Sequence, residues 1–565
     1  MKKVLSLLFV GILFIGVGCS SNQNNTKLPQ KESKKESNVI YDGTYGPIVK
    51  DKITLSVFFN DNANTPSDDK EIWQQLEKDL NVDIEHTANP NAKSVDDYNL
   101  HAIDGFPSDI VGGSKIYADA QRYAEQGAFY PLHELEHVMP NFHQYLNKPE
   151  NSEIKAAIMG IDGEYYIIPN LNPPATYIIA GTAMFIRQDW LDKLGLEVPQ
   201  TTEELEQVLI AFRDGDANGN GLKDEVPLVG NLNKTYASLP TLFGARTRDK
   251  EPTNGKMIAE GTSVKHAWFT EDMKNAIIEL SRWYDEGLID PEFITFEGDP
   301  LAYYFPNDLA GVTYEPLYWG GRLNYRDDAP EGFNLVGMLP PVNQVTNERM
   351  YNDERYRLKD HGWAISSSSK NPEAAAAFLD TFFTEEGHDL IGFGIKGIHY
   401  DDIETKQLFG MDFRVPHYIG EIGTEIYEEG KTRLTAVKER GGRLPLGLEN
   451  DYELGYGNLD EELPASYNTF VLYDEAKKSG ELKSGEYLPL LNGFMTSEER
   501  DEVAKLKSSI DSYAEENYHI FLTIPYKKID DKTWNAYIED AKKLGLDKLE
   551  KIYTTAYARY LEANK

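Results

Sequence analysis

The stretch AMFIRQDWLDKLGLEVPQTTEELEQVLIAFRD, residues 183–214, contains the alternation of elements that determines the fold. Its apolar start predicts a strand, and the residues after it predict a short helix that ends at Gly195. A second helix is expected after Thr201, because Thr201 and Glu204 have the spacing of a capping box. The apolar residues of this helix recur at helical spacing, which predicts one buried face: Leu205, Val208, Leu209 and Phe212.

The same alternation of strand and helix appears on both sides of this stretch. ITLSVFF (53–59), VDIEHTA (82–88) and SDIVGG (108–113) are short predicted strands, and a helix is expected after the first of them. Later, residues 371–387 predict a helix capped by Asn371, with Pro372 in its first turn and Gly387 as its stop. Alternating strands and helices indicate an α/β protein with a parallel sheet, and a chain of this length predicts two lobes.

The first 38 residues differ in kind from the rest. Two lysines followed by an apolar run from Val4 to Val17 predict a secretory signal, because the run is too short for a membrane span. Cys19 follows directly and is the only cysteine, which predicts an acylated lipoprotein cysteine carrying chains such as palmitate. An ordinary signal with an incidental cysteine is the alternative. Residues 20–38 are polar and lack aromatic side chains, so they predict a flexible tether.

The charge balance limits the possible partners. The chain has 57 Lys and Arg against 93 Asp and Glu, a net charge of -36. Such a chain is a poor partner for nucleic acid or for an anionic lipid surface. No segment after the signal approaches 18 consecutive apolar residues, and the phosphate-loop pattern G-x-x-x-x-G-K-[ST] is absent from the sequence.

Residues 214–228, DGDANGNGLKDEVPL, have the alternating acid and amide side chains of a calcium loop. The EF-hand pattern fits if the loop starts at Asp214, with Glu225 in the twelfth place. A start at Asp216 gives D-x-N-x-N-G-x-x-D-E instead. The EF-hand register needs a helix after Glu225, and Val226-Pro227 opposes one, which favours the Asp216 register. A metal-free Asn/Gly turn is the third possibility. Either metal register predicts a structural ion rather than a sensor.

A second motif, HELEH at residues 133–137, satisfies the zinc-protease pattern H-E-x-x-H. It lies between Pro131 and Pro140, and no convincing third-ligand motif follows. We therefore interpret it as a short polar surface helix.

Six features occur together in one order along the chain, and the ordered set is specific. After the lipoprotein signal come FPSDIVGG, DGEYYIIP, FIRQDWLDKLGLEVPQTTEEL, DANGNGLKDEVPL and WAISSSSKNPEAAAAFLDTFFTEEG. From about residue 50 to 565 the chain resembles the extracellular solute-binding proteins of carbohydrate ABC importers. It is most similar to the large type that includes alginate-oligosaccharide-binding proteins and the LplA lipoproteins.

The resemblance implies a periplasmic-binding-protein-like fold of type II, with two α/β lobes joined by hinge strands and the ligand cleft between them. It divides the chain into a signal peptide (1–18), an acylated cysteine with its tether (19–49), an N-terminal lobe (50–175 with about 312–370) and a C-terminal lobe (about 176–311 with 371–565). The implied protein is a monomeric, lipid-anchored receptor on the outer face of the cell membrane. It would pass an oligosaccharide to permease subunits that work with a separate ATPase, and it would not be an enzyme.

The resemblance also implies which residues hold a structural calcium ion in the C-terminal lobe. Side-chain oxygens would come from Asp216, Asn218, Asn220, Asp224 and Glu225, and Leu222 would supply its carbonyl oxygen.

The sugar-binding residues follow from chemistry, because pyranose rings stack on aromatic faces and their hydroxyls need planar polar groups. Loops after strands are the expected positions. The candidates are Asn60 and Asp61 after the first strand, Tyr314, Tyr318, Trp319 and Arg322 in TYEPLYWGGR, and Trp268 and Trp363. Gly320-Gly321 would let a ligand approach closely. For each aromatic residue, core packing is an equally good interpretation.

Two other functions stay open on the sequence. A secreted polysaccharide hydrolase or lyase would need a carboxylate pair or a basic constellation in the cleft. A binding protein for peptides or other solutes would rely on backbone-pairing groups rather than on stacked aromatic rings.

Overall fold

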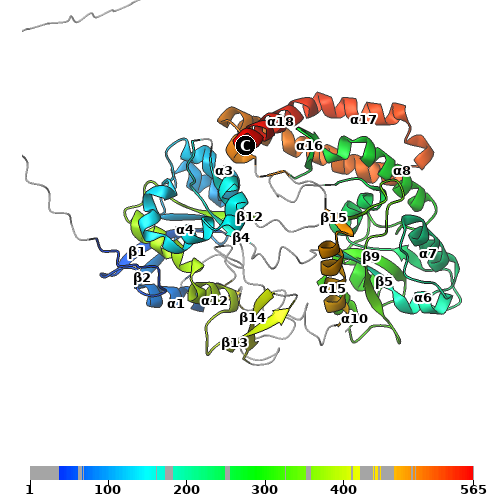
Figure 1. Ribbon diagram of the computed structural model, residues 1–565, viewed down its shortest axis with the longest axis horizontal. Coiled ribbons are helices and arrows are strands. Elements are labelled where there is room, and N and C mark those ends of the chain that lie inside the picture. Colours follow the sequence, from blue (N-terminus) through cyan, green and yellow to red (C-terminus); the bar gives the residue numbers. More distant parts are fainter. Residues whose placement is uncertain are drawn as a thin grey trace, which may run out of the picture. The chain divides into compact units, whose positions relative to one another are not determined.

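The computed structural model describes most of the chain after the tether: residues 37–60, 67, 69–160, 162–171, 182–247, 255–324, 326–351, 358–408, 411–419, 437, 439–442, 446, 464–484, 488–489 and 491–563. The residues before Val39 form a unit of their own, of which only Ser37 and Asn38 are described. The signal peptide and Cys19 therefore lie outside the described residues. From Val39 onward the chain forms a mixed α/β structure with two main sheets, each with its own core (Figure 1).

The first lobe is built on a five-stranded sheet with the order β2-β1-β3-β12-β4. β1 pairs in parallel with β2 and β3, as the sequence predicts, whereas β12 runs antiparallel to both β3 and β4. The strands are β1 (Ile53–Phe58), β2 (Val82–His86), β3 (Ile110–Gly113), β4 (Ile168–Leu171) and β12 (Leu358–Ile365).

Helices surround this sheet and bury their apolar faces against it. In α1 the predicted apolar residues Ile72, Trp73, Leu76 and Leu80 are all buried. The α-helices of this lobe are α1 (Glu71–Leu80), α2 (Ser94–Ile103), α3 (Ser114–Ala124), α4 (Pro140–Leu146), α5 (Ser152–Ile158), α11 (Pro372–Asp380) and α12 (Glu385–Phe393). Short 3₁₀ helices connect them at Leu132–Val138, Pro149–Asn151 and Thr381–Phe383.

The second lobe has a four-stranded sheet with the order β10-β5-β9-β6, in which only the β6–β9 pair is parallel. Its strands are β5 (Thr182–Arg187), β6 (Val226–Leu228), β9 (Ala310–Pro316) and β10 (Leu335–Met338). The capping box predicted at Thr201 and Glu204 is present at the start of α7. Gly195 ends α6 in the left-handed conformation, with φ 67°.

Most of the C-terminal half packs on this second sheet or on its neighbours (Figure 1). The α-helices are α6 (Gln188–Leu194), α7 (Thr202–Asp214), α8 (Glu271–Asp285), α9 (Pro300–Tyr304), α10 (Tyr318–Asn324), α15 (Pro464–Ser479), α16 (Ser497–Thr523), α17 (Asp531–Leu544) and α18 (Leu546–Ala563). Two-stranded pairs of this lobe are β7 (Met257–Glu260) with β8 (Ser263–His266) and β11 (Arg349–Tyr351) with β15 (Leu482–Ser484), whereas the pair of β13 (Tyr400–Leu408) with β14 (Met411–Tyr418) packs beside α12 of the first lobe.

One helix end predicted from the sequence is wrong. The helix that begins at Pro372 ends at Asp380, not at Gly387, and a 3₁₀ turn follows it. Thr384 then caps a new helix, α12, by accepting the N–H of Gly387 at 3.1 Å. Gly387 therefore lies inside the first turn of α12, where its ideal Cβ would come within 2.1 Å of the carbonyl oxygen of Thr381.

The division into lobes differs from the expected one in three places. β9 and β10, expected in the first lobe, belong to the second sheet because they pair with β5. α11 and α12, expected in the second lobe, pack in the core of the first, which buries Ala374 to Ala377. The expected tether reached residue 49, but Tyr41, Ile48 and Val49 are part of the first core.

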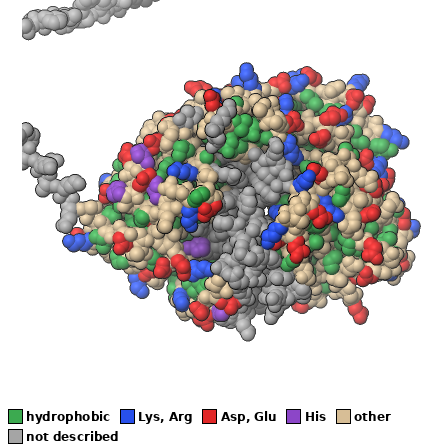
Figure 2. All heavy atoms as spheres, viewed as in Figure 1, with side chains coloured by type: hydrophobic (Ala, Val, Ile, Leu, Met, Phe, Trp, Pro, Cys, Tyr) green, Lys and Arg blue, Asp and Glu red, His purple; other side chains and the backbone are tan. Residues whose placement is uncertain are grey.

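The expected hinge strands fall outside the described residues. The chain passes from the first sheet to the second across residues 172–181 and returns across residues 352–357, and neither segment is described. In the part of the chain that is described, no helix is both long and apolar enough to cross a membrane. Figure 2 shows acidic and basic side chains interspersed over the described surface of one face.

A buried histidine joins the β7–β8 pair to the C-terminal helices. His266 is fully buried, its Nε2 lies 3.0 Å from a carboxylate oxygen of Asp511 on α16, and its Nδ1 accepts the N–H of Trp268. Burial lowers the pKa of His266, so the neutral ring donates from Nε2. Burial alone would raise the pKa of Asp511, but the hydrogen bond from His266 and the charge of Lys507 outweigh it and lower that pKa to about 2.

These shifts predict how stability depends on pH. The lowered pKa of Asp511 stabilises the fold above the unfolded pKa of about 4, and this contribution is lost as the pH falls towards 2. Asp511→Asn should therefore lower the free energy of unfolding by about 1–3 kcal/mol at pH 7. The difference from the unmodified protein should shrink between pH 4 and pH 2. Thermal unfolding in steps from pH 7 to 2.5 measures both effects.

A matched control is Asp531→Asn, because Asp531 pairs with Lys274 while its side chain is 87% exposed. It should change stability by no more than about 0.5 kcal/mol at any pH. A constant difference between Asp511→Asn and the unmodified protein across the whole range would contradict the assignment.

Candidate functional site

The residues predicted to bind sugar in the second lobe lie along β9 and α10. Tyr314 is buried in β9, and Trp319 is 4% exposed in a core cluster of this lobe. The guanidinium of Arg322 lies over the ring of Trp319, 4.6 Å from its centroid, and the Arg322 side chain is exposed. The structure thus brings Trp319 and Arg322 together at the lobe surface. The side chain of Tyr318 lies outside the described residues.

The glycines of this segment serve packing inside the protein rather than access for a ligand, which corrects the sequence interpretation. An ideal Cβ on Gly320 would lie 2.5 Å from the ring of Phe185. The N–H of Gly321 donates to the hydroxyl of Ser466 at 2.7 Å. The expected loop is a helix, α10, and these close approaches seat it against β5 and α15.

Glu315 was missed by the sequence analysis, although a carboxylate within an otherwise apolar strand was a signal for it. It is fully buried at the end of β9. One carboxylate oxygen accepts the N–H of Asn231 at 2.7 Å and the hydroxyl of Thr235 at 2.8 Å. Glu315 therefore fastens the π-helical turn Leu232–Tyr236 beside the strand that leads to Trp319.

In the first lobe the predicted residues lie at the end of β1 and on β12. The amide of Asn60 donates to the carbonyl of Asn89 and to the carboxylate of Asp97, both at 2.8 Å. Asn60 thus fixes the chain after β1, and Asp61 lies outside the described residues. Trp363 is fully buried, and its ring stacks on Phe59 at 4.9 Å.

Trp268 and Trp363 both take part in cores. Trp268 is 5% exposed in the second core, and its Nε1 donates to the carbonyl of Thr247 at 2.7 Å. An ideal Cβ on Gly112 would lie 2.5 Å from the ring of Trp363, so this glycine leaves room for the indole between β3 and β12. The described geometry therefore gives both indoles a packing role.

The predicted calcium loop follows α7 and is organised by its own polar side chains. Asp216 takes a left-handed φ of 50°, and its carboxylate accepts the N–H of Gly221 at 3.0 Å. The amide oxygens of Asn218 and Asn220 accept the N–H groups two residues ahead, at 3.0 and 2.6 Å. The amide nitrogens of the same two residues donate to Asp224 at 3.0–3.1 Å.

Outside the loop, two charged side chains have different roles. Asp214, the first residue of the alternative register, is the last residue of α7 and pairs with Arg213 at 2.7 Å. Lys193 on α6 donates to the carbonyl oxygens of Asp216 and Ala217 at 2.9 and 3.1 Å. The loop is therefore tied to α6 through its backbone.

Glu225 gives the clearest sign that the loop suits a cation. It is 7% exposed, and its Oε1 accepts the N–H of Asn218 at 3.2 Å. Its Oε2 is buried without a hydrogen-bond partner, which is a costly state for a carboxylate oxygen. A hard cation with oxygen ligands would satisfy it. Among the described residues no three Asp, Glu, His or Cys side chains gather closely enough to hold a metal, so amide and carbonyl oxygens would have to share the coordination.

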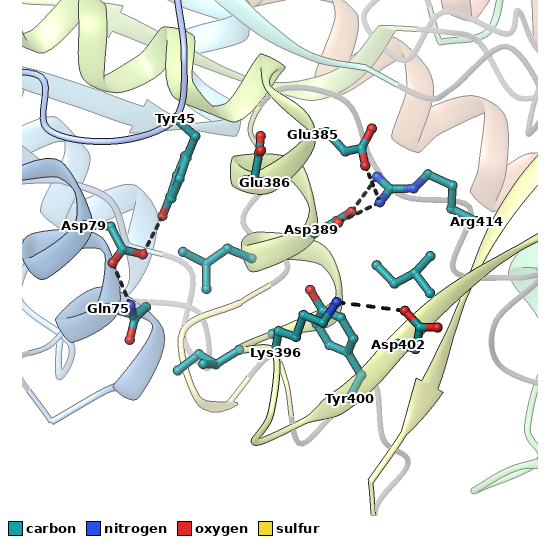
Figure 3. Close-up of a pocket in the computed structure, with 14 residues that line it drawn as sticks. Tyr45, Gln75, Asp79, Glu385, Glu386, Asp389, Lys396, Tyr400, Asp402 and Arg414 are labelled. Atoms are coloured by element: carbon teal, nitrogen blue, oxygen red, sulfur yellow. Dashed lines mark hydrogen bonds and ion pairs between the residues drawn. The ribbon is translucent and has the colours of Figure 1, made fainter.

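A polar pocket of about 490 Å³ lies in the first lobe between α1, α12 and the β13–β14 pair (Figure 3). Arg414 forms two 2.8 Å hydrogen bonds with Asp389 and a 3.0 Å ion pair with Glu385. On the opposite wall Asp79 accepts hydrogen bonds from Tyr45 at 3.1 Å and from Gln75 at 2.7 Å.

Burial in this pocket shifts the pKa values of two of its titratable groups. Burial raises the pKa of Asp389 to about 6, against the opposing effect of Arg414. Burial, together with the charge of Asp389, raises the pKa of Tyr400 to about 12. Because Arg414 and Asp389 satisfy each other, the pocket mainly joins α12 to the β13–β14 pair.

The HELEH segment forms a 3₁₀ helix, Leu132–Val138. Three residues make one turn of such a helix, so side chains four apart are rotated by about 120° from each other. His133 pairs with Glu164, and His137 pairs with Glu373 at 3.3 Å. The two histidines therefore have separate carboxylate partners and do not share a zinc site.

Comparison with known proteins identifies relatives of this chain. No protein-family model matches the chain. Over 538 residues it is 26% identical to FusA of Streptococcus pneumoniae, a fructooligosaccharide ABC transporter substrate-binding protein, and the match covers 92% of each chain. The chain is thus similar, over almost its whole length, to a solute-binding protein of a carbohydrate ABC importer. It is also 27% identical over 358 residues to the lipoprotein LipO of Bacillus subtilis, which covers 60% of this chain and 66% of LipO.

Solved structures confirm the two-lobe α/β fold. The alginate-binding protein AlgQ2, in a crystal structure without calcium ion, superimposes with a TM-score of 0.68 at 24% identity, covering 93% of this chain and all of AlgQ2. An EF-hand mutant of S. pneumoniae FusA in complex with fructo-nystose gives a TM-score of 0.64 at 23% identity, with 91% and 100% covered.

The burial of Trp363 predicts that this indole stabilises the first core. Trp363→Ala should lower the free energy of unfolding by about 3–5 kcal/mol, because it leaves a cavity between β3 and β12. Urea unfolding followed by circular dichroism measures the loss. Leu100→Ala is the control, since Leu100 is 62% exposed and its loss should cost less than about 0.5 kcal/mol. An unchanged stability of Trp363→Ala would show that this indole is not a core residue.

Proposed function

We propose that this protein captures an oligosaccharide outside the cytoplasm and delivers it to the permease of an ABC importer. The observation that carries the proposal is the match to FusA, which extends over 92% of both chains. A match of that length includes both lobes rather than a shared module. The α/β lobes with separate cores supply the architecture that such binding requires.

Capture would depend on side chains from both lobes that meet around the ligand. From the first lobe we propose the segment after β1, which contains Asn60 and Asp61. From the second we propose the segment from Tyr314 to Arg322. Closure of two lobes on a ligand gives the loaded form a different affinity for the permease from that of the empty form, and this difference would drive delivery.

Arg322 is the best-supported sugar contact of the second lobe. Its guanidinium is exposed and is held over the buried ring of Trp319. A planar group with five fixed donors suits the hydroxyls of a sugar, and the indole beneath it restricts its movement. Trp319 would then orient Arg322 rather than stack on the sugar itself.

The proposed role is binding without catalysis. The relative FusA and the structurally similar AlgQ2 are binding proteins, which supports this role over that of a polysaccharide hydrolase or lyase. The two functions can be told apart with one sugar, because a binding protein releases it intact and a hydrolase or lyase shortens it.

The test is to incubate the protein with a panel of plant and bacterial oligosaccharides. A bound sugar should raise the melting temperature, and chromatography should recover it unshortened. Arg322→Ala should weaken binding of that sugar by about 1–3 kcal/mol in calorimetry, with little change in stability. Arg326→Ala is the matched control, because Arg326 pairs with Asp328 and should leave the affinity unchanged. Shortened products from the panel would favour the enzyme.

The anchor and the partners complete the proposal. Cys19, acylated after signal cleavage, would hold the protein at the outer membrane face, and the relative LipO is named a lipoprotein. The permease and its ATPase would be separate chains, and the receptor would act as a monomer.

We also propose a structural calcium ion in the loop of the second lobe. The ligands would be Asp216, Asn218, Asn220, Asp224 and Glu225, with the carbonyl of Leu222. The unpaired Oε2 of Glu225 supports the ion, and the pairing of Asp214 with Arg213 supports the register that starts at Asp216. Bound calcium would supply the positive charge that the loop's buried carboxylate lacks.

Chelation should reveal the ion. Removing calcium with EGTA should lower the melting temperature, since a ligand at 100 times its Kd stabilises the folded state by about 2.7 kcal/mol. Asp224→Ala should abolish this sensitivity, whereas Asp214→Ala should keep it. The reverse pattern in differential scanning calorimetry would establish the other register.

A further inference from the structure

One side chain of the predicted calcium loop, Asn218, forms a hydrogen bond with a distant part of the second lobe. The amide nitrogen of Asn218 donates to the backbone carbonyl of Asp308 at 3.2 Å, as well as to Asp224 at 3.0 Å. An amide whose nitrogen is held in this way keeps its oxygen turned the other way, and that oxygen accepts the N–H of Asn220 inside the loop. The orientation of Asn218 therefore depends on where the Asp308 carbonyl lies.

The position of that carbonyl is set by an unusual backbone conformation. Asp308 has a φ of 59°, in the left-handed region that residues with a Cβ rarely adopt. Its N–H donates to Phe305 at 3.1 Å. Its carboxylate Oδ1 accepts two further hydrogen bonds, from Arg187 at 2.6 Å and from the indole of Trp190 at 3.3 Å. The side chain of Asp308 thus holds its own turn in place.

The groups that hold Asp308 are themselves buried and make further contacts. Arg187 is 1% exposed and forms hydrogen bonds of 2.8 and 2.5 Å with Asp189. Its guanidinium lies between the rings of Trp190 and Phe333, at 4.7 and 4.4 Å from their centroids. A continuous series of contacts therefore runs from the end of β5 through Asp308 to the loop.

We propose that Asp308 is a positioning residue of the metal loop. Its carboxylate, held by Arg187 and Trp190, fixes the turn before β9, and the carbonyl of that turn orients the amide of Asn218 so that its oxygen faces the ion. This inference rests on the calcium site of the proposed function. Groups that orient metal ligands from outside the coordination sphere commonly change metal affinity by 10- to 100-fold.

A merely structural role for Asp308 would be to balance the charge of Arg187. Three variants separate the two roles. Asp308→Asn keeps the Oδ1 acceptor and tolerates a positive φ, Asp308→Gly keeps only the backbone freedom, and Asp308→Ala keeps neither. Loss of charge alone affects all three variants, whereas loss of the acceptor affects only Gly and Ala.

The experiment is a calorimetric titration of metal-stripped protein with Ca²⁺, with the melting temperature of each variant as a second readout. Asp308→Ala and Asp308→Gly should bind Ca²⁺ about tenfold or more weakly than the unmodified protein, and Asp308→Asn should stay within about twofold. Asp511→Asn is the control, because it should destabilise the same lobe from the His266 side without changing the affinity for Ca²⁺.

Each outcome decides the inference. Equal Ca²⁺ affinity in Asp308→Ala and the unmodified protein would overturn it, even if the variant melted at a lower temperature. Equally weak binding by all three variants would show that charge, not the acceptor, is what matters, and would also overturn it. If the unmodified protein takes up no Ca²⁺, the calcium proposal itself fails before any variant is compared.

Discussion

The ion pairs of the buried Arg187 with Asp189 and Asp308 are the interactions on which the proposed sites of the second lobe depend. A charge removed from water is tolerated only when it is paired and hydrogen-bonded, and here Asp189 and Asp308 provide the pairing. These residues come from the end of β5, the start of α6 and the turn before β9. The guanidinium of Arg187 joins these three segments. The predicted calcium loop and the strand that leads to Trp319 are therefore both positioned through Arg187.

Several charged and aromatic side chains described above serve the packing of the two lobes. Two of the described carboxylates with shifted pKa values have structural partners: Asp511 pairs with His266 and Lys507, and Asp389 pairs with Arg414. Four aromatic residues expected to meet a sugar are buried in the cores: Tyr314, Trp319, Trp268 and Trp363. In the proposed function, recognition would then fall to polar groups at the lobe surface, with buried rings behind them.

Local signals in the sequence were reliable where local geometry decides the structure. The capping box of Thr201 and the left-handed Gly195 depend on neighbours within a few residues, and both were predicted. Gly387 was wrongly predicted to end a helix, because Thr384 caps a new helix and Gly387 lies in the first turn of that helix. The spacing of residues 216–225 predicted a metal loop, but it gave no sign of the hydrogen bond to Asp308, since Asp308 lies 90 residues from Asn218 and accepts through a backbone carbonyl.

The larger errors concern contacts that no local pattern encodes. An indole that stacks on sugar and one that fills a gap over Gly112 have the same sequence signature, so Trp363 could not be placed in advance. The lobe boundaries failed for a related reason. Hydrogen bonds with β5 and β6 decide that β9 belongs to the second sheet. The alanines of α11 could pack in either core, so their sequence does not assign the helix to a lobe.

The order of strands in the first sheet has a consequence for how the protein is made. β12 lies between β3 and β4, yet it follows all four strands of the second sheet in the chain. Until β12 is present, β3 and β4 each have an unpaired edge. Unpaired strand edges are templates for aggregation. The first lobe closes only when almost two-thirds of the polypeptide has been made. A chain cut before β12 would leave the first sheet divided, with β4 separated from β3.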